Sequence, residues 1–231
     1  MRKNAFPITA GVLGSLALAV SASGQFINVT IEDYAAAGQP AGSVTYRVVA
    51  HWASDAVFLA WGAIPGDGEL IFFTGNGVNL MNDDGSPFFG SKQEDFAQFP
   101  IASDWDSWLT VGKTGFAGNN TDYSTDFIGS DGKNAAVVGN AFSETDGLVF
   151  NSNPGNEVIG TDLVLAQFTI PGGKGNPHNG FHLEGIVAWN PVGAGPGFNV
   201  SPFSVDNIPA PGALALLGLA GLAGARRRRR G

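Results

Sequence analysis

Three histidines are the side chains of this 231-residue chain best suited to moving protons at neutral pH. His178 and His182 are four residues apart, and Glu184 follows them. On a helix, this spacing would bring both imidazoles to one metal ion. Pro177 and Gly180 disfavour a helix there. On a strand, four residues would separate the two histidines by about 13 Å. We therefore expect separate surface histidines and no metal site at this position.

Nucleophilic catalysis by cysteine is excluded, because the chain contains no cysteine. The same composition excludes disulfides, zinc–thiolate sites and iron–sulfur clusters. A Ser-His-Asp hydrolase stays open as an alternative, and His51, beside Trp52, is the third histidine. The G-x-S-x-G motif, which places a serine nucleophile on a sharp turn, does not occur in the chain. We therefore assign no catalytic residue.

Oxygen ligands for a hard cation are concentrated in the loop 82–86, which contains Asp83 and Asp84. Calcium binds several carboxylate and carbonyl oxygens, usually at alternating positions. The loop does not complete an EF-hand, because Gln93 stands where the twelfth-position glutamate belongs. We expect ordinary Asp and Asn turn chemistry here. If the chain does bind a metal, calcium at Asp83 and Asp84 is the best candidate.

Five tryptophans are the residues most able to stack on sugar rings. Trp61 and Trp189 fall in apolar runs and are predicted to be core residues. Trp105 and Trp108 are an odd number of positions apart, so on a strand they face opposite sides and at most one is in the core. Trp105, which two aspartates flank, is the candidate for ligand contact.

The elements that position these residues are predicted to be strands. Val44, Tyr46 and Val48 alternate with Thr45 and Arg47, as in a strand with one buried face. Asp-Gly and Pro-Gly pairs separate the apolar runs and favour reverse turns. Only the segment 31–38 suggests a helical turn. The predicted strands lie at 43–50, 56–61, 70–74, 107–111, 147–150, 163–170 and 181–189.

Seven or more short strands without long intervening helices predict an all-β fold. We expect an antiparallel β-sandwich, immunoglobulin-like or jelly-roll-like, with a barrel as the alternative. It would occupy residues 25–207, because no internal repeat or second-domain boundary interrupts them. The segment 192–203 is interpreted as the last edge strand or as the start of a linker.

The formal net charge of −8 conceals a segregation of charges. All 20 acidic residues lie between Glu32 and Asp206, where only five basic residues occur, so this part of the chain carries about −15. A surface of this sign repels phosphate backbones. Nucleic acid is therefore not expected as a partner, whereas divalent cations and basic surfaces are permitted.

The N-terminus has the pattern of a secretory signal peptide, residues 1–24. Arg2 and Lys3 precede an apolar run at 10–20, and small residues follow at 22–24. Signal peptidase is expected to cleave between Gly24 and Gln25. The chain is therefore predicted to be exported, with a signal helix that lies outside the folded domain.

The C-terminus, residues 208–231, has the pattern of a membrane stop-transfer segment. An apolar run of Ala, Leu and Gly at 213–225 is short against the roughly 20 residues that span a bilayer comfortably. The positive-inside rule would keep the basic end in the cytoplasm, which would place residues 25–207 outside the membrane. The basic end consists of Arg226, Arg227, Arg228, Arg229 and Arg230.

The same tail resembles the PEP-CTERM sorting signal, which combines a Pro-Glu-Pro motif, a short transmembrane helix and an arginine-rich end. Pro209, Ala210 and Pro211 stand at the motif, so that alanine replaces the usual glutamate. The resemblance implies that the tail is inserted in the membrane only transiently, before processing by an exosortase, a membrane-embedded cysteine protease. Delivery to the cell surface or extracellular matrix would follow. The segments 104–115, 144–150 and 163–171 are similar to segments of other secreted PEP-CTERM proteins.

Taken together, these patterns predict a cell-surface or matrix β-domain with a non-enzymatic structural or binding role. The expected partners are signal peptidase, an exosortase and extracellular polysaccharide. The alternative function is a carbohydrate-binding module that uses exposed aromatics and calcium. A secreted hydrolase is the third interpretation.

Overall fold

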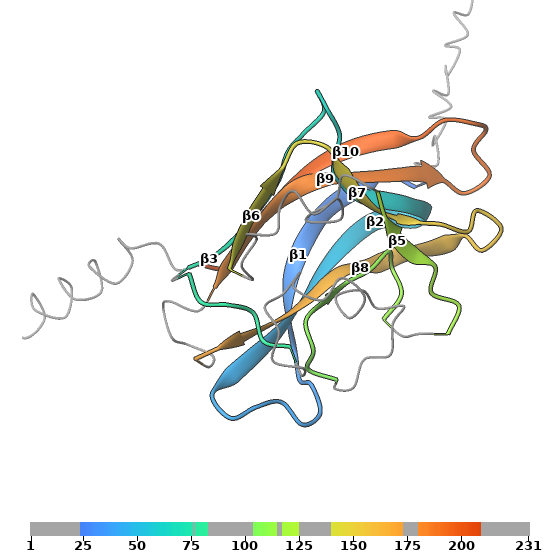
Figure 1. Ribbon diagram of the computed structural model, residues 1–231. Coiled ribbons are helices and arrows are strands. Elements are labelled where there is room, and N and C mark those ends of the chain that lie inside the picture. The colour runs from blue at the N-terminus through green and yellow to red at the C-terminus, as the bar shows by residue number, and fades with distance from the viewer. Residues whose placement is uncertain are drawn as a thin grey trace, which may run out of the picture.

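The computed structural model describes residues 24–75, 77–82, 104–114, 117–124, 140–172 and 180–208. In these residues the regular structure is β-strand, and no helix occurs among them. All paired strands are antiparallel (Figure 1), which confirms the predicted all-β, antiparallel class. The strands are β1 (Phe26–Tyr34), β2 (Ser43–Ala63), β3 (Leu70–Thr74), β4 (Trp108–Leu109), β5 (Thr121–Tyr123), β6 (Ala141–Glu144), β7 (Gly147–Asn151), β8 (Val158–Pro171), β9 (Phe181–Pro191) and β10 (Asn199–Asp206).

Strand β2 is the central element, with 21 residues. Its first half pairs with β1 on one edge and β8 on the other, and its second half pairs with β9 and β7. The two strands predicted at 43–50 and 56–61 are therefore the two halves of one strand. Between the halves, β2 advances from His51 to Ala56 while β8 advances only from Asp162 to Gly160. The extra residues bend β2, and the sheet curls into a half-barrel (Figure 1).

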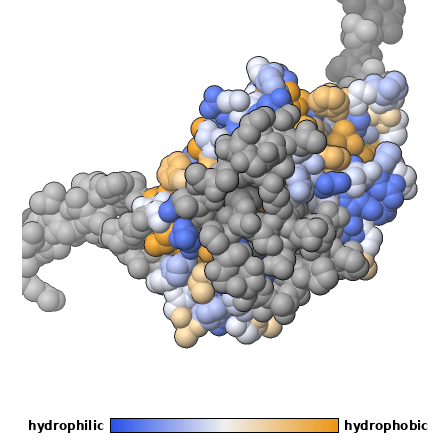
Figure 2. All heavy atoms as spheres, viewed as in Figure 1, coloured by the Kyte–Doolittle hydropathy of each residue, from blue (hydrophilic) through white to orange (hydrophobic). Residues whose placement is uncertain are grey.

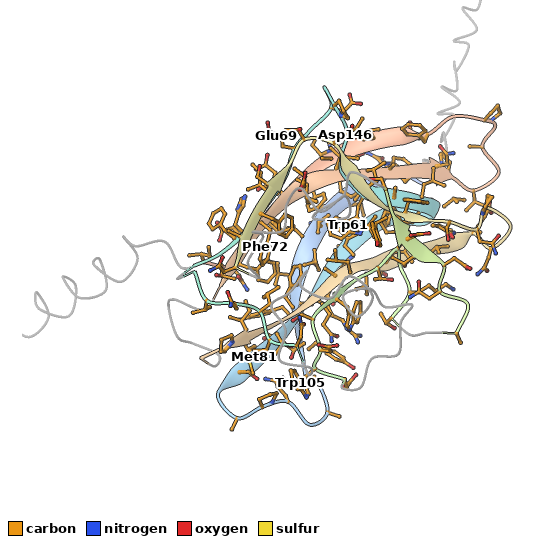
Figure 3. The ribbon with its side chains drawn as sticks, viewed as in Figure 1. Trp61, Glu69, Phe72, Met81, Trp105 and Asp146 are labelled. Carbon is orange, nitrogen blue, oxygen red and sulfur yellow. The ribbon has the colours of Figure 1, made fainter. Side chains whose placement is uncertain are left out.

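The concave side of this sheet is filled by aromatic side chains. Ring centres of Phe168 on β8 and Phe72 on β3 lie 5.0 Å apart, and those of Phe168 and Phe181 on β9 lie 5.1 Å apart. In the hydrogen-bonded order β4-β8-β2-β9-β3-β6, β8 is a neighbour of neither β3 nor β9. These contacts therefore depend on the curl. Phe72 and Trp61 both lie among the strands in Figure 3, and both are almost completely buried.

The predicted helical turn at 31–38 is wrong. Ile31 to Tyr34 complete β1 and pair with Val48 to Thr45 of β2. An isolated helical turn would fix several dihedral angles in return for one hydrogen bond, whereas a ladder satisfies backbone groups all along the segment. The chain turns only after the strand, where the Ala36 N–H donates to the Tyr34 carbonyl (3.1 Å).

Two other predicted strands differ in extent from the structure. The segment 107–111 contributes only two residues of regular strand, β4. The segment 192–203 contains a turn and then the start of β10, which is an edge strand beside β9. The signal helix predicted within 1–24 and the hydrophobic helix predicted within 208–231 lie outside the described residues, apart from their innermost positions at Gly24 and Ile208.

Replacement of the central aromatic tests the fold. We expect Phe168→Ala to lower the free energy of unfolding by about 3–5 kcal/mol, because a fully buried ring is removed. Urea denaturation followed by tryptophan fluorescence measures the change. Phe198→Ala is the matched control, since that ring is 60% exposed and its loss should change stability by only about 0.5 kcal/mol or less. Equal effects of the two substitutions would contradict the curled core.

Candidate functional site

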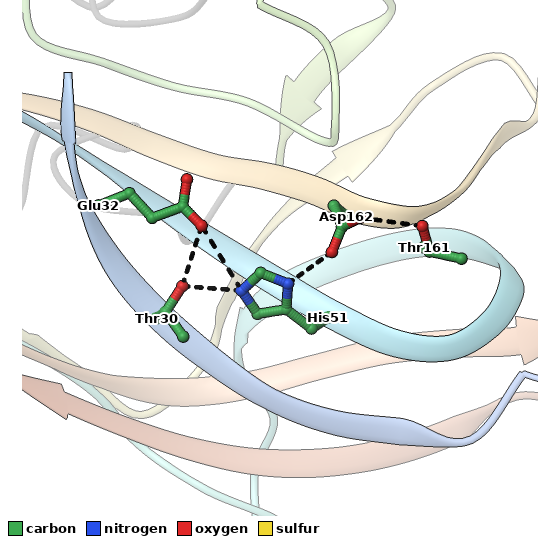
Figure 4. A network of polar contacts seen from close by, with 5 residues as sticks. All are labelled: Thr30, Glu32, His51, Thr161 and Asp162. Carbon is green, nitrogen blue, oxygen red and sulfur yellow. Dashed lines mark hydrogen bonds and ion pairs between the residues drawn. The ribbon is translucent and has the colours of Figure 1, made fainter. Parts of the chain in front are cut away.

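The convex side of the sheet carries a hydroxyl, an imidazole and a carboxylate in line. His51 of β2 lies directly opposite Asp162 of β8, and Thr30 comes from β1 on the other edge of β2. The Thr30 hydroxyl lies 2.7 Å from His51 Nε2, and His51 Nδ1 lies 2.6 Å from Asp162 Oδ1 (Figure 4). Three neighbouring strands therefore bring together three side chains that are far apart in the sequence.

The proton positions follow from the carboxylate. The hydrogen bond from His51, followed by one from Thr161, lowers the pKa of Asp162 below its ordinary value. An ionised carboxylate can only accept, so His51 Nδ1 carries the proton. In neutral His51, Nε2 is then free to accept the hydrogen of the Thr30 hydroxyl. This order of hydroxyl, imidazole and carboxylate is the one used by hydrolases that activate a hydroxyl nucleophile.

A second carboxylate borders the same imidazole. Glu32 Oε1 lies 3.4 Å from the Thr30 hydroxyl and 3.9 Å from His51 Nε2. When His51 is protonated, both of its nitrogens donate, and the Thr30 hydroxyl can turn its hydrogen towards Glu32. The side chains of Glu32 and Asp162 are 53% and 65% exposed, so water screens their charges. The imidazole of His51 thus lies between two carboxylates on an open surface.

A different polar cluster occupies the other end of this face. The Arg47 guanidinium carbon lies 3.5 Å from the centre of the Tyr34 ring, and the Tyr34 hydroxyl donates to Asp104 at 2.9 Å. Burial, followed by the hydrogen bond to Asp104, raises the pKa of Tyr34, and Arg47 opposes this rise. Arg47 Nε also donates to Gln167 Oε1 at 3.0 Å. The interactions link β1, β2 and β8 to the segment that precedes β4.

His182 is the only other histidine in the described part of the chain. It stacks on Phe73 with ring centres 4.9 Å apart, and its nitrogens lie 3.6 Å from Glu184 and 3.5 Å from Asp206. No group of three His, Asp or Glu side chains in the described ranges is arranged to hold a metal ion. His178 lies outside these ranges, so the predicted separation of the two histidines stays a prediction.

Trp105 is half-buried, and its backbone is held against β8. The Thr169 hydroxyl donates to the Trp105 carbonyl, and Gln167 Nε2 donates to the carbonyls of Asp104 (2.9 Å) and Asp106 (2.8 Å). The ring lies at the edge of the molecule in Figure 3. Its role in ligand contact stays a prediction. Trp108, by contrast, is 2% exposed.

The other predictions for tryptophan are confirmed. Trp61 is fully buried and donates its indole N–H to the Thr110 carbonyl (2.8 Å). Trp189 is 8% exposed, and its indole N–H donates to the Ser201 hydroxyl (3.1 Å). Each indole N–H is thus satisfied by a polar partner inside or beside the core.

A groove of about 610 Å³ separates the two edge strands β1 and β10. Its walls combine apolar side chains, such as Val29, Ile31 and Val205, with the carboxylates of Asp33 and Asp206. Hydroxylated ligands suit this mixture, because carboxylates accept their hydrogen bonds while aliphatic surface contacts their carbon atoms.

Several predicted site residues fall outside the described ranges. Of the predicted processing sites, Gly24 and Gln25 are described, and both belong to the approach to β1. The described residues include no helix with the length and apolar character needed to cross a membrane. The undescribed candidates are Asp83, Asp84, Pro209, Ala210, Pro211, Arg226, Arg227, Arg228, Arg229 and Arg230.

Comparisons of this chain with protein-family models, with curated proteins and with solved structures found no match. The site is therefore interpreted from its geometry. Sequence reasoning missed Thr30, Glu32 and Asp162, because their proximity depends on the registers of β1 and β8 against β2. The one available signal was His51 itself, which directly follows the strand predicted at 43–50.

The lowered pKa of Asp162 predicts a pH effect. The His51–Asp162 contact stabilises the folded state above about pH 3.8, the ordinary pKa, and this contribution is lost as pH falls through the lowered pKa. Asp162→Asn should remove that contribution, which we expect to be at most about 1 kcal/mol because the carboxylate is exposed. Urea denaturation between pH 5 and pH 2.5 measures it. Asp67→Asn, in an exposed turn, is the control, and identical pH profiles for the two variants would contradict the assignment.

Proposed function

We propose that residues 25–207 are the body of an exported cell-surface or extracellular-matrix protein with a structural or binding role. One observation carries the proposal: the first strand begins at Phe26 and the last ends at Asp206. Cleavage at the predicted signal-peptidase and exosortase sites would therefore interrupt none of the described strands. Strands β1 and β10, each paired with a single neighbour, lead directly to the ends at which processing is proposed.

The surface of the body supports a role in a hydrated matrix. Hydrophilic residues gather over the turn between β7 and β8 in Figure 2, where the chain reads Ser-Asn-Pro-Gly-Asn-Glu at 152–157. The charge of about −15 keeps such a domain soluble and favours cations and hydroxylated polymers over anionic ones. Polysaccharide is the partner that the groove between β1 and β10 fits best.

We also infer that the half-barrel is a variant of a β-sandwich. The curl places β8 opposite β3 and β9, and their aromatic rings meet in one core. Tyr46 on the first half of β2 likewise lies 5.9 Å from Phe181 on β9, ring centre to ring centre. Contacts of this kind are those of two facing layers that share one bent strand.

The processing hypothesis is tested on the native protein. Intact-mass measurement of the protein recovered from the cell surface or culture medium should give a mass that lacks both the leader and the five arginines. The arginines lie beyond the tail motif that an exosortase would read, so their loss reports C-terminal processing separately from signal cleavage. Recovery of the full-length chain from the cytoplasm would refute the proposal.

A second candidate function, hydrolysis of esters, is favoured by the alignment of Thr30, His51 and Asp162. His51 would take the proton of the Thr30 hydroxyl as that oxygen attacks the acyl carbon, and would pass it to the alcohol oxygen as the ester bond breaks. Water would then hydrolyse the acyl-threonine to release the acid and restore Thr30, while Asp162 orients the imidazole. The convex site is open, so a small activated ester can reach it.

Hydrolysis of p-nitrophenyl acetate tests this candidate. If the relay is catalytic, Thr30→Val should reduce the rate to that of buffer, whereas Thr30→Ser should retain it, because serine keeps the hydroxyl. Thr161→Val is the control, since that hydroxyl contacts only the far side of Asp162. Equal rates for the wild type and Thr30→Val would eliminate the hydrolase.

A further inference from the structure

Gly24 is part of the folded structure. Its N–H donates to the Ser54 hydroxyl at 2.6 Å, and the residue is buried. The carbonyl of the next residue, Gln25, accepts a hydrogen bond from the Ala53 N–H at 2.8 Å. Ser54 and Ala53 belong to the bend of β2. The hydrogen bonds of residues 24 and 25 therefore hold the start of β1 against that bend.

The position also requires glycine. The φ angle of Gly24 is +71°, in the left-handed region that other residues rarely adopt. A Cβ atom there would lie 2.8 Å from Pro191 Cα and 3.3 Å from the Trp189 ring. The backbone of Gly24 therefore fills a corner between the bend of β2 and the end of β9, into which no side chain fits.

Cleavage between Gly24 and Gln25 would discard this residue. The Ser54 hydroxyl would lose this hydrogen bond, Pro191 and Trp189 would lose a neighbour, and the chain would begin at the exposed Gln25. Gly24 donates a hydrogen bond, adopts a left-handed backbone and packs against β9, so we expect the mature chain to retain it. This disagrees with the cleavage site that the small residues 22–24 predict.

We propose that the mature chain retains Gly24 and begins at Ser23, which places signal-peptidase cleavage between Ala22 and Ser23. The inference rests on the proposed export of the protein. Ala22 is then the small residue that ends the leader, with the short aliphatic Val20 two positions before it. Water is added across the Ala22–Ser23 peptide bond, which leaves a carboxylate on Ala22 and an ammonium on Ser23.

N-terminal sequencing of the exported native protein tests the inference. A sequence that starts at Ser23 is expected. A start at Gln25 would overturn the inference and leave the proposed export intact, because the leader would still have been removed. A start at Met1 would overturn both.

The variant Gly24→Ala in the full chain provides a second, independent readout. Alanine is also small, so the leader remains cleavable at either site. If residue 24 is retained, the exported variant should be heavier by one methylene group and should melt roughly 5 °C lower than the wild type. If residue 24 is removed with the leader, the two exported proteins will be identical in mass and in melting temperature.

Gly38→Ala is the matched control for this variant. Gly38 has a similar φ of +69°, but a Cβ atom there would meet nothing within 4 Å. The decrease in melting temperature of the control should therefore reflect only the strain of placing alanine in left-handed backbone. A decrease in melting temperature no larger for Gly24→Ala than for Gly38→Ala would contradict the packed corner.

Discussion

The bend in β2 is the constraint on which the rest of the structure depends. A 21-residue strand cannot remain flat and bury apolar side chains on only one side, because a single open sheet has no second layer to cover them. Extra residues between His51 and Ala56 let one strand belong to both parts of the curled sheet. Trp52 stabilises the bend from within, with its ring centre 5.5 Å from that of Phe58 and 5.8 Å from that of Phe26.

The polar features of the protein gather around the same bend. His51 is the last residue paired with β8 before the irregularity, and its partners on β1 and β8 tie three strands together there. On the opposite side of the bend, Ser54 and Ala53 receive the start of the folded chain at Gly24 and Gln25. A bent strand leaves backbone groups without the partners that a regular ladder would supply, and these contacts satisfy several of them.

Acidic side chains on the described surface contact the histidines, and some of them line a groove. Each of the two described imidazoles is flanked by two carboxylates. Three of these four carboxylates belong to a strand next to that of the histidine, whereas Glu184 shares β9 with His182. Asp206 also lines the groove between β1 and β10, together with Asp33 of β1. Carboxylates thus link neighbouring strands in a domain without disulfides, and Asp206 does so while it also lines the groove.

The sequence by itself determined the strand class, the core tryptophans Trp61 and Trp189 and the absence of any cysteine chemistry. Alternation and apolar runs are local patterns, and they indicate which side chains will be buried whatever the order of the strands in the fold. Only the tertiary structure decided that two predicted strands are one, that the segment 31–34 is strand, and that Thr30, His51 and Asp162 meet. Strand register joins residues more than a hundred positions apart, and no local pattern encodes which partner a strand will choose.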